Sequence, residues 1–358
     1  MIKIVYIIGR LAYGGAEKAL LDLCRKINKQ KFEITVVVLQ EDNPLAEQFE
    51  DAGVKVHFMR KKTKFDFSII KKLAEYLEII KPDIIHTHLF AADFWGGQAA
   101  RSAGVKKIIS TRHDVIKEDF WRNLLGKRMR RSFNKVIAVS KAIRDYLIKV
   151  EKVSLEKVKV IYNGLDISKF YISDPDLFTS GKLRIGSVGR LNKEKGHKHL
   201  IRACRLIKNN NWELTLVGDG PLRGELEESV KALGIEEKVK FTGNVSDVRP
   251  YLEKMDIFVL PSVTEGLSLA VLEAALSGRI IVATKVGGVP EIVEHEQTGL
   301  LFKPKNIEQL VSHINWVDEH RYQSEKMALK LQAEAKEKFD INKIIKKYED
   351  LYENLAGK

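Results

Sequence analysis

The sequence predicts an α/β protein of two domains, each built on a doubly wound parallel sheet. Its 358 residues exceed the usual size of one hydrophobic core. Short runs rich in β-branched residues alternate with amphipathic helical segments almost from end to end, as in parallel sheets with crossover helices. The stretch FYISDPDLFTSG (170–181) interrupts this alternation with Pro, Gly, Ser and Asp, and we interpret it as a linker.

Seven strands are expected in the first half, with helices between them. The predicted strands are KIVYIIG (3–9), ITVVVL (34–39), VKVHFM (54–59), DIIHTH (83–88), KIIST (107–111), KVIAVS (135–140) and KVKVIY (157–162). The clearest amphipathic helices between them are AEKALLDLCRKI (16–27) and FSIIKKLAEYLEII (67–80). We assign residues 1–170 to the first domain.

A second alternation follows the linker and defines the second domain, residues 171–340. Its predicted strands are LRIGSVGR (183–190), ELTLVGDG (213–220), KVKFTGN (238–244), DIFVLPS (256–262) and RIIVATKVGG (279–288). Residues 306–358 have a helical pattern without a further strand. We expect the last helix, 341–358, to pack back on the first domain.

The composition is that of a soluble protein, because no run of 18 apolar residues occurs. The apolar stretch in the opening MIKIVYIIGR is too short for a signal peptide, so we expect a cytoplasmic location. Cys24 and Cys204 lie in helical patterns far apart in the chain. They are expected to be buried thiols and not a disulfide.

The net charge of +13 is confined to the first half of the chain. Residues 1–170 hold 33 Lys and Arg against 20 Asp and Glu, whereas residues 171–358 hold 28 against 28. A field of one sign in one domain suits an anionic partner, which could be nucleic acid, a phosphorylated substrate or an anionic membrane surface.

Ligands of open parallel sheets bind beyond the carboxyl ends of the strands, so functional residues are expected there. The first strand leads into IIGRLAYGGAEKALLDL, where Gly14 and Gly15 precede a helix. These glycines would let backbone amides approach an anion at the positive end of that helix. The loop matches neither the P-loop nor G-x-G-x-x-G, and a plain tight turn is an equal alternative.

A second loop, in SVGRLNKEKGHKHL, carries Arg190 and Lys195 between a strand and a helix. Two cations at this place suit a diphosphate, because Arg offers a forked set of donors and Lys a point charge. A solvated run of charged residues is the alternative interpretation.

Two glutamates lie eight positions apart in TEGLSLAVLEAAL, Glu265 in a loop after a strand and Glu273 in a helix. Eight helical residues rise about 12 Å, roughly the reach of a small extended ligand. Carboxylates accept hydrogen bonds from paired sugar hydroxyls, so the two acids could hold the two ends of one ligand. Alternatively, Glu265 caps the helix and Glu273 pairs with a surface cation.

We expect this helix to begin near Gly266 or Leu267. The backbone amides of Gly266, Leu267 and Ser268 would then point toward an anion held by Arg190 and Lys195. This arrangement predicts an anion site at the carboxyl edge of the second sheet.

Three histidines lie at strand ends in the first domain. His86 and His88 share one strand and point to the same face, and His113 follows the next strand in STRHD. Three imidazoles could bind zinc, but no cysteine supports them, and hydrogen-bonded histidines at strand ends are commoner. His113, followed by Asp114, is better placed for substrate contact.

One D-x-D pattern occurs, formed by Asp174 and Asp176. A divalent ion that bridges phosphates would require such a pair at a strand end. This pair falls in the linker, so we interpret it as turn chemistry and predict no metal site.

Together these segments resemble the retaining nucleotide-sugar glycosyltransferases of family 4, which have the GT-B fold of two facing Rossmann-like domains. Nearly the whole chain takes part, and the E-x7-E spacing is the mark of the family. The segments that carry the resemblance are GGAEKALLDL, IYNGLD, SVGRLNKEKGH, LVGDGPLRGELE, FTGNVSDVRPYLEKMDIFVLPSVTEGLSLAVLEA and KVGGVPEIVEHEQTGLLF.

The resemblance implies roles for the charged residues of the second domain. Arg190 and Lys195 match the cations that bind the donor diphosphate. Glu273 matches the partner of the nucleotide ribose, and Glu265 the carboxylate next to the donor sugar. Glu265, Arg190 and Lys195, together with His113 of the first domain, are the expected catalytic residues.

Other positions follow from the same resemblance. Gly15, next to Gly14, matches the glycine loop that closes over the phosphates. His113 matches the active-site histidine of the acceptor domain. The nucleotide base is expected near Gly218 and Asn244. Such enzymes usually need neither metal nor cofactor, and their donors are UDP- or GDP-sugars.

Within that family the acceptor binds the first domain, which here carries the excess positive charge. The segment FWRNLLGKRMRRSF (120–133) joins Phe120, Trp121, Leu124, Leu125 and Met129 to Arg122, Lys127, Arg128, Arg130 and Arg131. Such a helix, with RKKTK (60–64), suits peripheral contact with anionic lipid. We therefore expect a lipid-linked or cell-envelope glycan acceptor at the inner face of the plasma membrane. A helix with a solvated basic face is the alternative.

Two other classes of protein share single features with this sequence. A nucleotide-sugar 2-epimerase shares the two-domain architecture but lacks this glutamate spacing. A nucleic-acid binder is suggested only by the pI near 9.4, and it is disfavoured by the absence of a recognised motif and by the neutral second half. We therefore expect no nucleic-acid partner.

Overall fold

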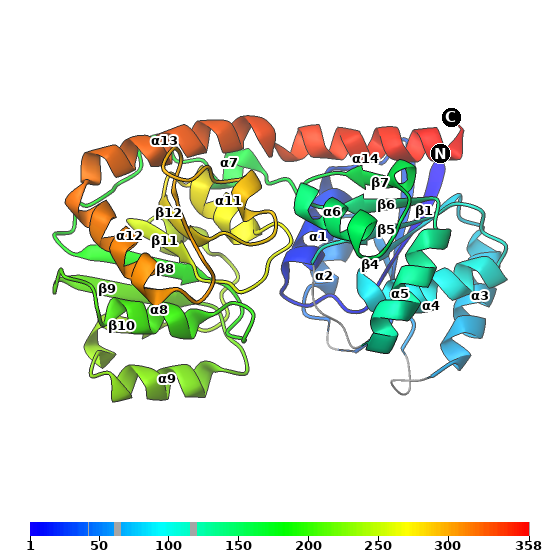
Figure 1. Ribbon diagram of the computed structural model, residues 1–358. Coiled ribbons are helices and arrows are strands. Elements are labelled where there is room, and N and C mark those ends of the chain that lie inside the picture. Colours follow the sequence, from blue (N-terminus) through cyan, green and yellow to red (C-terminus); the bar gives the residue numbers. More distant parts are fainter. Residues whose placement is uncertain (42, 61–65, 115–119, 358) are drawn as a thin grey trace. The chain divides into compact units, whose positions relative to one another are not determined.

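The computed structural model describes residues 1–358 except 42, 61–65, 115–119 and 358 (Figure 1). Its contacts divide the chain into two compact units. Unit 1 comprises residues 1–164 and 341–358, and unit 2 comprises residues 165–340. The C-terminal segment, red in Figure 1, therefore belongs with the N-terminal part of the chain.

The division between the units falls at Gly164–Leu165, earlier than the expected boundary at residue 170. The reason is that helix α7 (Ile167–Phe170) packs against helix α11 (Leu269–Leu276) of unit 2. In addition, the Ser277 hydroxyl donates a hydrogen bond of 3.2 Å to the Phe170 carbonyl.

Unit 1 contains, among its described residues, a seven-stranded parallel sheet in the order β3-β2-β1-β4-β5-β6-β7. All seven strands were predicted from the sequence. They are β1 (Ile2–Ile8), β2 (Phe32–Val38), β3 (Lys55–Phe58), β4 (Ile84–His88), β5 (Ile108–Arg112), β6 (Lys135–Ala138) and β7 (Val158–Val160).

Helices cover both faces of this sheet. They are α1 (Gly15–Lys26), α2 (Ala46–Asp51), α3 (Ser68–Ile80), α4 (Leu89–Ser102), α5 (Phe120–Ser132), α6 (Lys141–Lys149), the 3-10 turn η1 (Leu155–Lys157) and α14 (Ile341–Ala356). Alternate residues of β1 define the two cores. Ile4 and Tyr6 join a core with α1 and α14, whereas Val5 and Ile7 join one with α3 and α4.

Unit 2 is built on a six-stranded parallel sheet in the order β10-β9-β8-β11-β12-β13 within the described chain. Its strands are β8 (Leu183–Val188), β9 (Trp212–Val217), β10 (Val239–Phe241), β11 (Ile257–Leu260), β12 (Ile280–Thr284) and β13 (Leu300–Phe302). The sequence predicted the first five. It missed β13, because three apolar residues are too few to show a strand period.

The remaining helices of unit 2 are α8 (His197–Cys204), α9 (Arg223–Ala232), η2 (Glu236–Lys238), α10 (Arg249–Leu252), η3 (Val289–Glu291), α12 (Ile307–Glu319) and α13 (Arg321–Lys338). The predicted helical region after residue 306 is thus divided into three helices. Together with the sheets, these elements confirm the predicted fold class of two doubly wound parallel-sheet α/β domains.

Both cysteines are free and buried, as the sequence analysis expected. Burial raises the pKa of the Cys24 thiol to about 12 and also raises the pKa of Cys204. In the part of the chain that the structure describes, no helix is both long enough and apolar enough to cross a bilayer.

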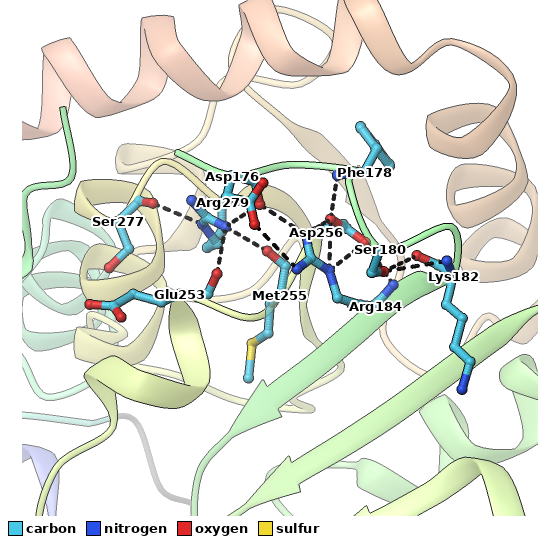
Figure 2. A network of polar contacts seen from close by, with 10 residues as sticks. All are labelled: Asp176, Phe178, Ser180, Lys182, Arg184, Glu253, Met255, Asp256, Ser277 and Arg279. Atoms are coloured by element: carbon cyan, nitrogen blue, oxygen red, sulfur yellow. Dashed lines mark hydrogen bonds and ion pairs between the residues drawn. The ribbon is translucent and has the colours of Figure 1, made fainter. Parts of the chain in front are cut away.

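A buried ionic network fastens the linker to the amino ends of strands β8 and β11 (Figure 2). Asp256, which has no exposed surface, accepts hydrogen bonds from the backbone N–H groups of Phe178 at 2.6 Å and Arg184 at 2.7 Å. The Arg184 guanidinium donates to the same carboxylate at 2.6 Å and to the Asp176 carbonyl at 2.8 Å. The linker is therefore held at the end of the sheet opposite to the carboxyl ends of its strands.

Arg279 extends this network and is fully buried (Figure 2). It donates to the carbonyl oxygens of Met255 at 2.7 Å and Ser277 at 2.8 Å. Burial, together with the charge of nearby Arg184, lowers the pKa of Arg279 to about 10. Arg279 thus joins the start of β11 to the end of α11.

We expect Asp256→Ala to lower the free energy of unfolding by about 3–5 kcal/mol, because it leaves the Arg184 guanidinium and two backbone amides without their acceptor. Urea denaturation at pH 7 measures this change. Asp174→Ala, at an exposed position of the same linker, serves as the control and should change stability by less than about 0.5 kcal/mol. Equal effects of the two substitutions would show that the linker is not fastened through Asp256.

Candidate functional site

Strand order reverses between β8 and β11 in unit 2. The chain runs outward from β8 to β10 on one side and from β11 to β13 on the other. At such a reversal the loops that leave the two carboxyl ends diverge and leave space for a ligand. The predicted site residues Arg190 and Lys195 follow β8, and Glu265 follows β11, so they flank this point.

Arg190 and Lys195 lie on the loop between β8 and α8. Arg190 is exposed and has no ion-pair partner among the described residues. The Lys195 backbone N–H donates to the Asn192 side chain at 3.1 Å, which fixes the turn of the loop. Both positive charges therefore lie at the carboxyl edge of the sheet and not in the core.

Lys195 and Glu265 form an ion pair across the reversal point. The Lys195 ammonium lies 2.6 Å from Oε1 of Glu265, and the Ser262 hydroxyl donates to the same oxygen at 2.7 Å. The side chain of Glu265 is only 9% exposed and that of Lys195 is 26% exposed. In this partly buried setting, the ion pair holds a carboxylate and a cation next to each other.

The helix after Glu265 begins later than the sequence predicted. Helix α11 starts at Leu269, and Ser268 is its N-cap, whose hydroxyl accepts from the Val271 backbone N–H at 3.4 Å. The start near Gly266 or Leu267 was therefore wrong, because Ser is a strong N-cap residue and sets the boundary.

Gly266, Leu267 and Ser268 form the loop that leads into α11. Their backbone N–H groups have no acceptor in the part of the chain that the structure describes. Backbone donors of this kind, next to the positive end of a helix, are the groups that bind anions in proteins. The chemistry expected of these residues does not depend on their being helical.

Glu273 lies in the second turn of α11 and is 4% exposed. A surface ion pair, the alternative weighed from the sequence, does not fit this burial. A carboxylate so deeply placed requires hydrogen-bond donors close to it. Glu265 and Glu273 therefore lie at the two ends of a short segment, one in the loop and one in the helix.

The other predicted residues of unit 2 lie at neighbouring strand ends. Gly218 follows β9, and its backbone N–H donates to the Gly243 carbonyl at 3.0 Å. A Cβ at Gly218 would lie 2.3 Å from the Gly189 carbonyl oxygen, so the loops after β8 and β9 touch at this glycine. Asn244, next to Gly243, is exposed. The structure thus gathers Gly218, Asn244 and the Arg190 loop along one edge.

Unit 1 places Gly14 and Gly15 at the start of α1, after β1. Gly14 is the N-cap, and a Cβ there would lie 2.4 Å from Oε2 of Glu17. The Glu17 carboxylate therefore already occupies the positive end of this helix. Tyr13, in the same loop, is 57% exposed.

His113 lies just after β5 in unit 1, and its Nε2 is 3.0 Å from Nδ1 of His88 at the end of β4. Burial, with the nearby charge of Arg112, lowers the pKa of His113 to about 3. Burial also holds the pKa of His88 well below its usual value. Both imidazoles are therefore neutral at pH 7.

The described residues contain no group of three or more His, Cys, Asp or Glu side chains that could hold a metal ion. His86 and His88 point to the same face of β4, as predicted, with ring centroids 4.4 Å apart. His86 is bonded to the hydroxyl groups of Tyr352 at 2.8 Å and Thr111 at 2.7 Å. It is thus a hydrogen-bonded core histidine, which was the commoner of the two interpretations.

Helix α5 shows which part of the basic segment 120–131 is exposed. Leu124 is 50% and Leu125 43% exposed, and Arg128 and Arg131 are also exposed. Arg130, in contrast, is fully buried and pairs with Asp93 and Glu151. Met129 is 5% exposed. The inclusion of Arg130 and Met129 in a surface cluster was therefore wrong, because these two side chains face the core.

Several other members of the predicted basic and apolar segments lie outside the described residues. The side chains of residues 120–123 and all of residues 61–64 lie outside the described residues. Arg60, at the edge of the second segment, is described and lies 3.6 Å from the Glu41 carboxylate.

Two residues that support the site were not singled out in the sequence. Ser262 appeared only as the end of a strand, yet its hydroxyl holds Glu265. Gly287 has φ of +50°, and a Cβ there would lie 1.8 Å from the Glu265 carbonyl oxygen. The Gly288 backbone N–H also donates to the Gly266 carbonyl at 2.8 Å. The glycine pair in KVGGVP is a sequence signal that could have found this contact.

Two family models match the chain. The model described as glycosyl transferases group 1 matches residues 172–338, and the model of glycosyltransferase family 4 matches residues 13–169. The two matches fall on successive halves of the sequence and meet near the linker.

Several known proteins are similar over most of the chain. An uncharacterized glycosyltransferase of Methanocaldococcus jannaschii is 30% identical over 305 residues, which cover 76% of this chain and 77% of that relative. A UDP-Gal:alpha-D-GlcNAc-diphosphoundecaprenol alpha-1,3-galactosyltransferase of Escherichia coli is 26% identical over 377 residues, 98% of this chain and 96% of that relative. The crystal structure of Anabaena Alr3699/HepE with UDP-glucose has a TM-score of 0.90 at 24% identity and covers 99% of this chain and 100% of that one.

We expect Gly287→Ala to destabilise the protein by about 1–3 kcal/mol, because its methyl group would displace the backbone at Glu265. Denaturant midpoints measure the change. Gly234→Ala is the matched control, since Gly234 also has positive φ (+64°) and a Cβ there meets no atom within 4 Å, so it should destabilise less, by about 1 kcal/mol. If both variants are equally stable, the loop of Glu265 does not depend on Gly287.

Proposed function

The chain belongs to glycosyltransferase family 4 and has the GT-B fold, and from this premise we propose that it is a retaining transferase that uses a nucleoside diphosphate sugar. The proposed acceptor is a lipid-linked or cell-envelope glycan. The observation that carries the proposal is the Lys195–Glu265 ion pair at the strand reversal of unit 2, followed directly in the chain by three backbone amides without acceptors among the described residues.

The diphosphate of the donor is proposed to bind between the loop after β8 and the start of α11. Arg190 and Lys195 supply the positive charge, and the amides of Gly266, Leu267 and Ser268 supply uncharged donors. Such donors are fixed before the reaction, so they stabilise the negative charge that develops on the leaving diphosphate.

The two glutamates would hold the sugar residues of the donor. Glu265 has two carboxylate oxygens, and the second is available to a hydroxyl of the transferred sugar while the first accepts from Ser262 and Lys195. Glu273 is proposed to accept the ribose hydroxyls. Gly218 and Asn244, at neighbouring strand ends, would border the base.

Unit 1 is proposed to supply the acceptor side. Gly14 and Gly15 would lie against the phosphates, and His113 would contact the transferred sugar. Because the Glu17 carboxylate already lies at the start of α1, the loop would approach the phosphates through backbone N–H groups more than through the helix dipole.

We propose front-face substitution with retention of the anomeric configuration. Glu265 is engaged by Lys195 and Ser262, which makes it a poor nucleophile, and the leaving phosphate is the base nearest to the acceptor hydroxyl in this scheme. The anomeric configuration of the product, observed by NMR, tests retention. Activity that persists in excess EDTA would support a reaction without a metal.

The donor is proposed to be a UDP-sugar. The E. coli relative is named for UDP-Gal, and the HepE crystal structure contains UDP-glucose. The same relative is named for an acceptor linked to diphosphoundecaprenol, which agrees with a lipid-linked acceptor for this chain. A panel of nucleotide sugars in a thermal-shift assay would rank the donors.

Peripheral contact with the inner face of the plasma membrane is proposed for unit 1, through the exposed residues of α5. Leu124 and Leu125 are apolar and exposed, and Lys127, Arg128 and Arg131 lie on the same helix. Apolar side chains that insert between lipids, beside cations that bind anionic headgroups, are the two components of interfacial binding. The excess positive charge of residues 1–170 acts in the same direction.

We expect Lys195→Ala to weaken binding of UDP by about 10- to 100-fold, because a charge-assisted hydrogen bond contributes about 1.5–3 kcal/mol. Isothermal titration calorimetry with UDP, and with GDP for comparison, measures it. Glu265→Gln should leave UDP binding equal or tighter, since Lys195 loses its competing partner, while transfer slows. Lys193→Ala, at an exposed lysine of the same loop, is the control and should change binding less than about twofold. Equal effects at positions 193 and 195, or no binding of either nucleotide, would contradict the proposal.

We expect Arg128→Glu to reduce flotation with vesicles of phosphatidylglycerol and phosphatidylcholine by at least about fivefold, because each basic residue near an anionic surface contributes about 1 kcal/mol. The double variant Leu124→Ser, Leu125→Ser should reduce flotation as well. Lys72→Glu makes the same charge change on α3 of unit 1 and should have a smaller effect. If Lys72→Glu and Arg128→Glu act equally, only the net charge matters and α5 is not the contact surface.

A further inference from the structure

Two imidazoles in unit 1 are joined by a hydrogen bond at the carboxyl ends of neighbouring strands. Nδ1 of His88, at the end of β4, lies 3.0 Å from Nε2 of His113, just after β5. The ring centroids are 5.3 Å apart with an interplanar angle of 28°. Both rings are neutral at pH 7, because burial lowers the pKa of each. One ring must therefore donate its single N–H to the other.

The outer nitrogens of this pair have no protein partner. His88 Nε2 and His113 Nδ1 are buried and make no hydrogen bond within the described chain. If His88 donates through Nδ1–H, then His113 carries its proton on Nδ1. If His113 donates through Nε2–H, then His88 carries its proton on Nε2. Each arrangement leaves one N–H group without a protein acceptor, and the two differ in which ring bears it.

The two residues differ in exposure, although both outer nitrogens are buried. His88 is 2% exposed, and its ring packs against the Tyr6 ring at a centroid distance of 5.6 Å. His113 is partly exposed as a whole and lies in the loop that leaves the sheet. A buried N–H without an acceptor is costly and rare, so we assign the N–H to the ring nearer the surface, where a bound molecule could supply the acceptor.

The position of His88 is itself fixed from several sides. Its ring lies 4.4 Å from that of His86, which is bonded through Nδ1 to Tyr352 and through Nε2 to Thr111. The next residue, Leu89, has φ of +68°, a left-handed conformation unfavourable for leucine. Strained backbone of this kind persists where surrounding contacts fix it, and such residues cluster at functional sites.

We propose that His88 is the positioning residue for His113, holding it as the Nδ1–H tautomer so that it donates a hydrogen bond to an oxygen of the bound sugar. The second half of this statement rests on the proposed function, whereas the tautomer does not. His88 need not touch the substrate, since it acts through Nε2 of His113. The same bond fixes the plane of the His113 ring.

Nitrogen-15 NMR of histidine-labelled protein at pH 7 tests the tautomer directly, because protonated and unprotonated imidazole nitrogens have distinct chemical shifts. We expect His113 to be protonated at Nδ1 and His88 also at Nδ1. A wild-type His113 protonated at Nε2 would overturn the proposal. This measurement requires neither donor nor acceptor, so it remains decisive if no transferase activity is found.

Three variants separate positioning from folding. In His88→Asn the side-chain amide can replace the Nδ1–H donor, so we expect His113 to keep its tautomer and the turnover rate to fall less than about tenfold. In His88→Gln the amide replaces the Nε2 side instead, and in His88→Leu no donor remains. Both should release His113 to the Nε2–H tautomer and lower kcat by about 100-fold, with KM for the donor changed less than about threefold.

His57→Asn is the control, since His57 lies on β3, stacks on Tyr76 and is far from His88 in strand order. It should leave the tautomer and kcat unchanged. If His88→Asn and His88→Leu lose activity equally while both stay folded, His88 acts through packing and the proposal is wrong. Transfer that proceeds with His113 protonated at Nε2 would overturn the inference but leave the proposed function intact.

Discussion

The reversal of strand order in each sheet is the constraint on which the rest of the molecule depends. In unit 2 the chain fills β8 to β10 on one side and then returns to place β11 against β8, so two loops leave adjacent strand ends in opposite directions. Lys195 on one loop and Glu265 on the other then meet at 2.6 Å although 70 residues separate them in sequence. The cation and the acid come together because parallel strands direct their carboxyl ends to the same edge.

The ion pair also explains how charged groups can be partly buried at this edge of the sheet when no ligand is bound. Glu265 is only 9% exposed, and an unpaired carboxylate there would be costly, but Lys195 and Ser262 compensate it. An incoming diphosphate would compete with Oε1 of Glu265 for Lys195, whereas the second carboxylate oxygen could accept a sugar hydroxyl. The amides of Gly266, Leu267 and Ser268 face no such competition, because they have no acceptor in the described chain. The charges of Lys195 and Glu265 thus neutralise each other, whereas the three backbone amides can still donate to a ligand.

The sequence predicted this architecture well where local patterns determine it. Apolar runs located the strands, and Gly, Arg, Lys and Glu at their ends located the candidate site, because chain direction and strand period are local properties. Two of the differences do have a local signal: Ser268 is a strong N-cap residue for the start of α11, and the Gly287–Gly288 pair indicates the close contact with the backbone at Glu265. Local patterns could not show that Arg130 would turn inward to Asp93 and Glu151. The basic run around Arg130 was expected at the surface, because charge density says nothing about which member of the run has a buried acid opposite it.

The last helix shows why unit 1 is not a contiguous piece of the chain. Residues 341–358 belong to it, and Tyr352 of α14 is fully buried, with its hydroxyl 2.8 Å from both Tyr6 on β1 and His86 on β4. A hydroxyl between two buried polar groups satisfies both, and burial raises the pKa of Tyr352, so it remains a donor at all physiological pH values. His86 in turn packs against His88, whose partner is His113. Helix α14 therefore completes the hydrogen bonding of His86, which packs against His88, the partner of the proposed active-site residue His113. Residues that are far apart in the sequence thus form one polar cluster.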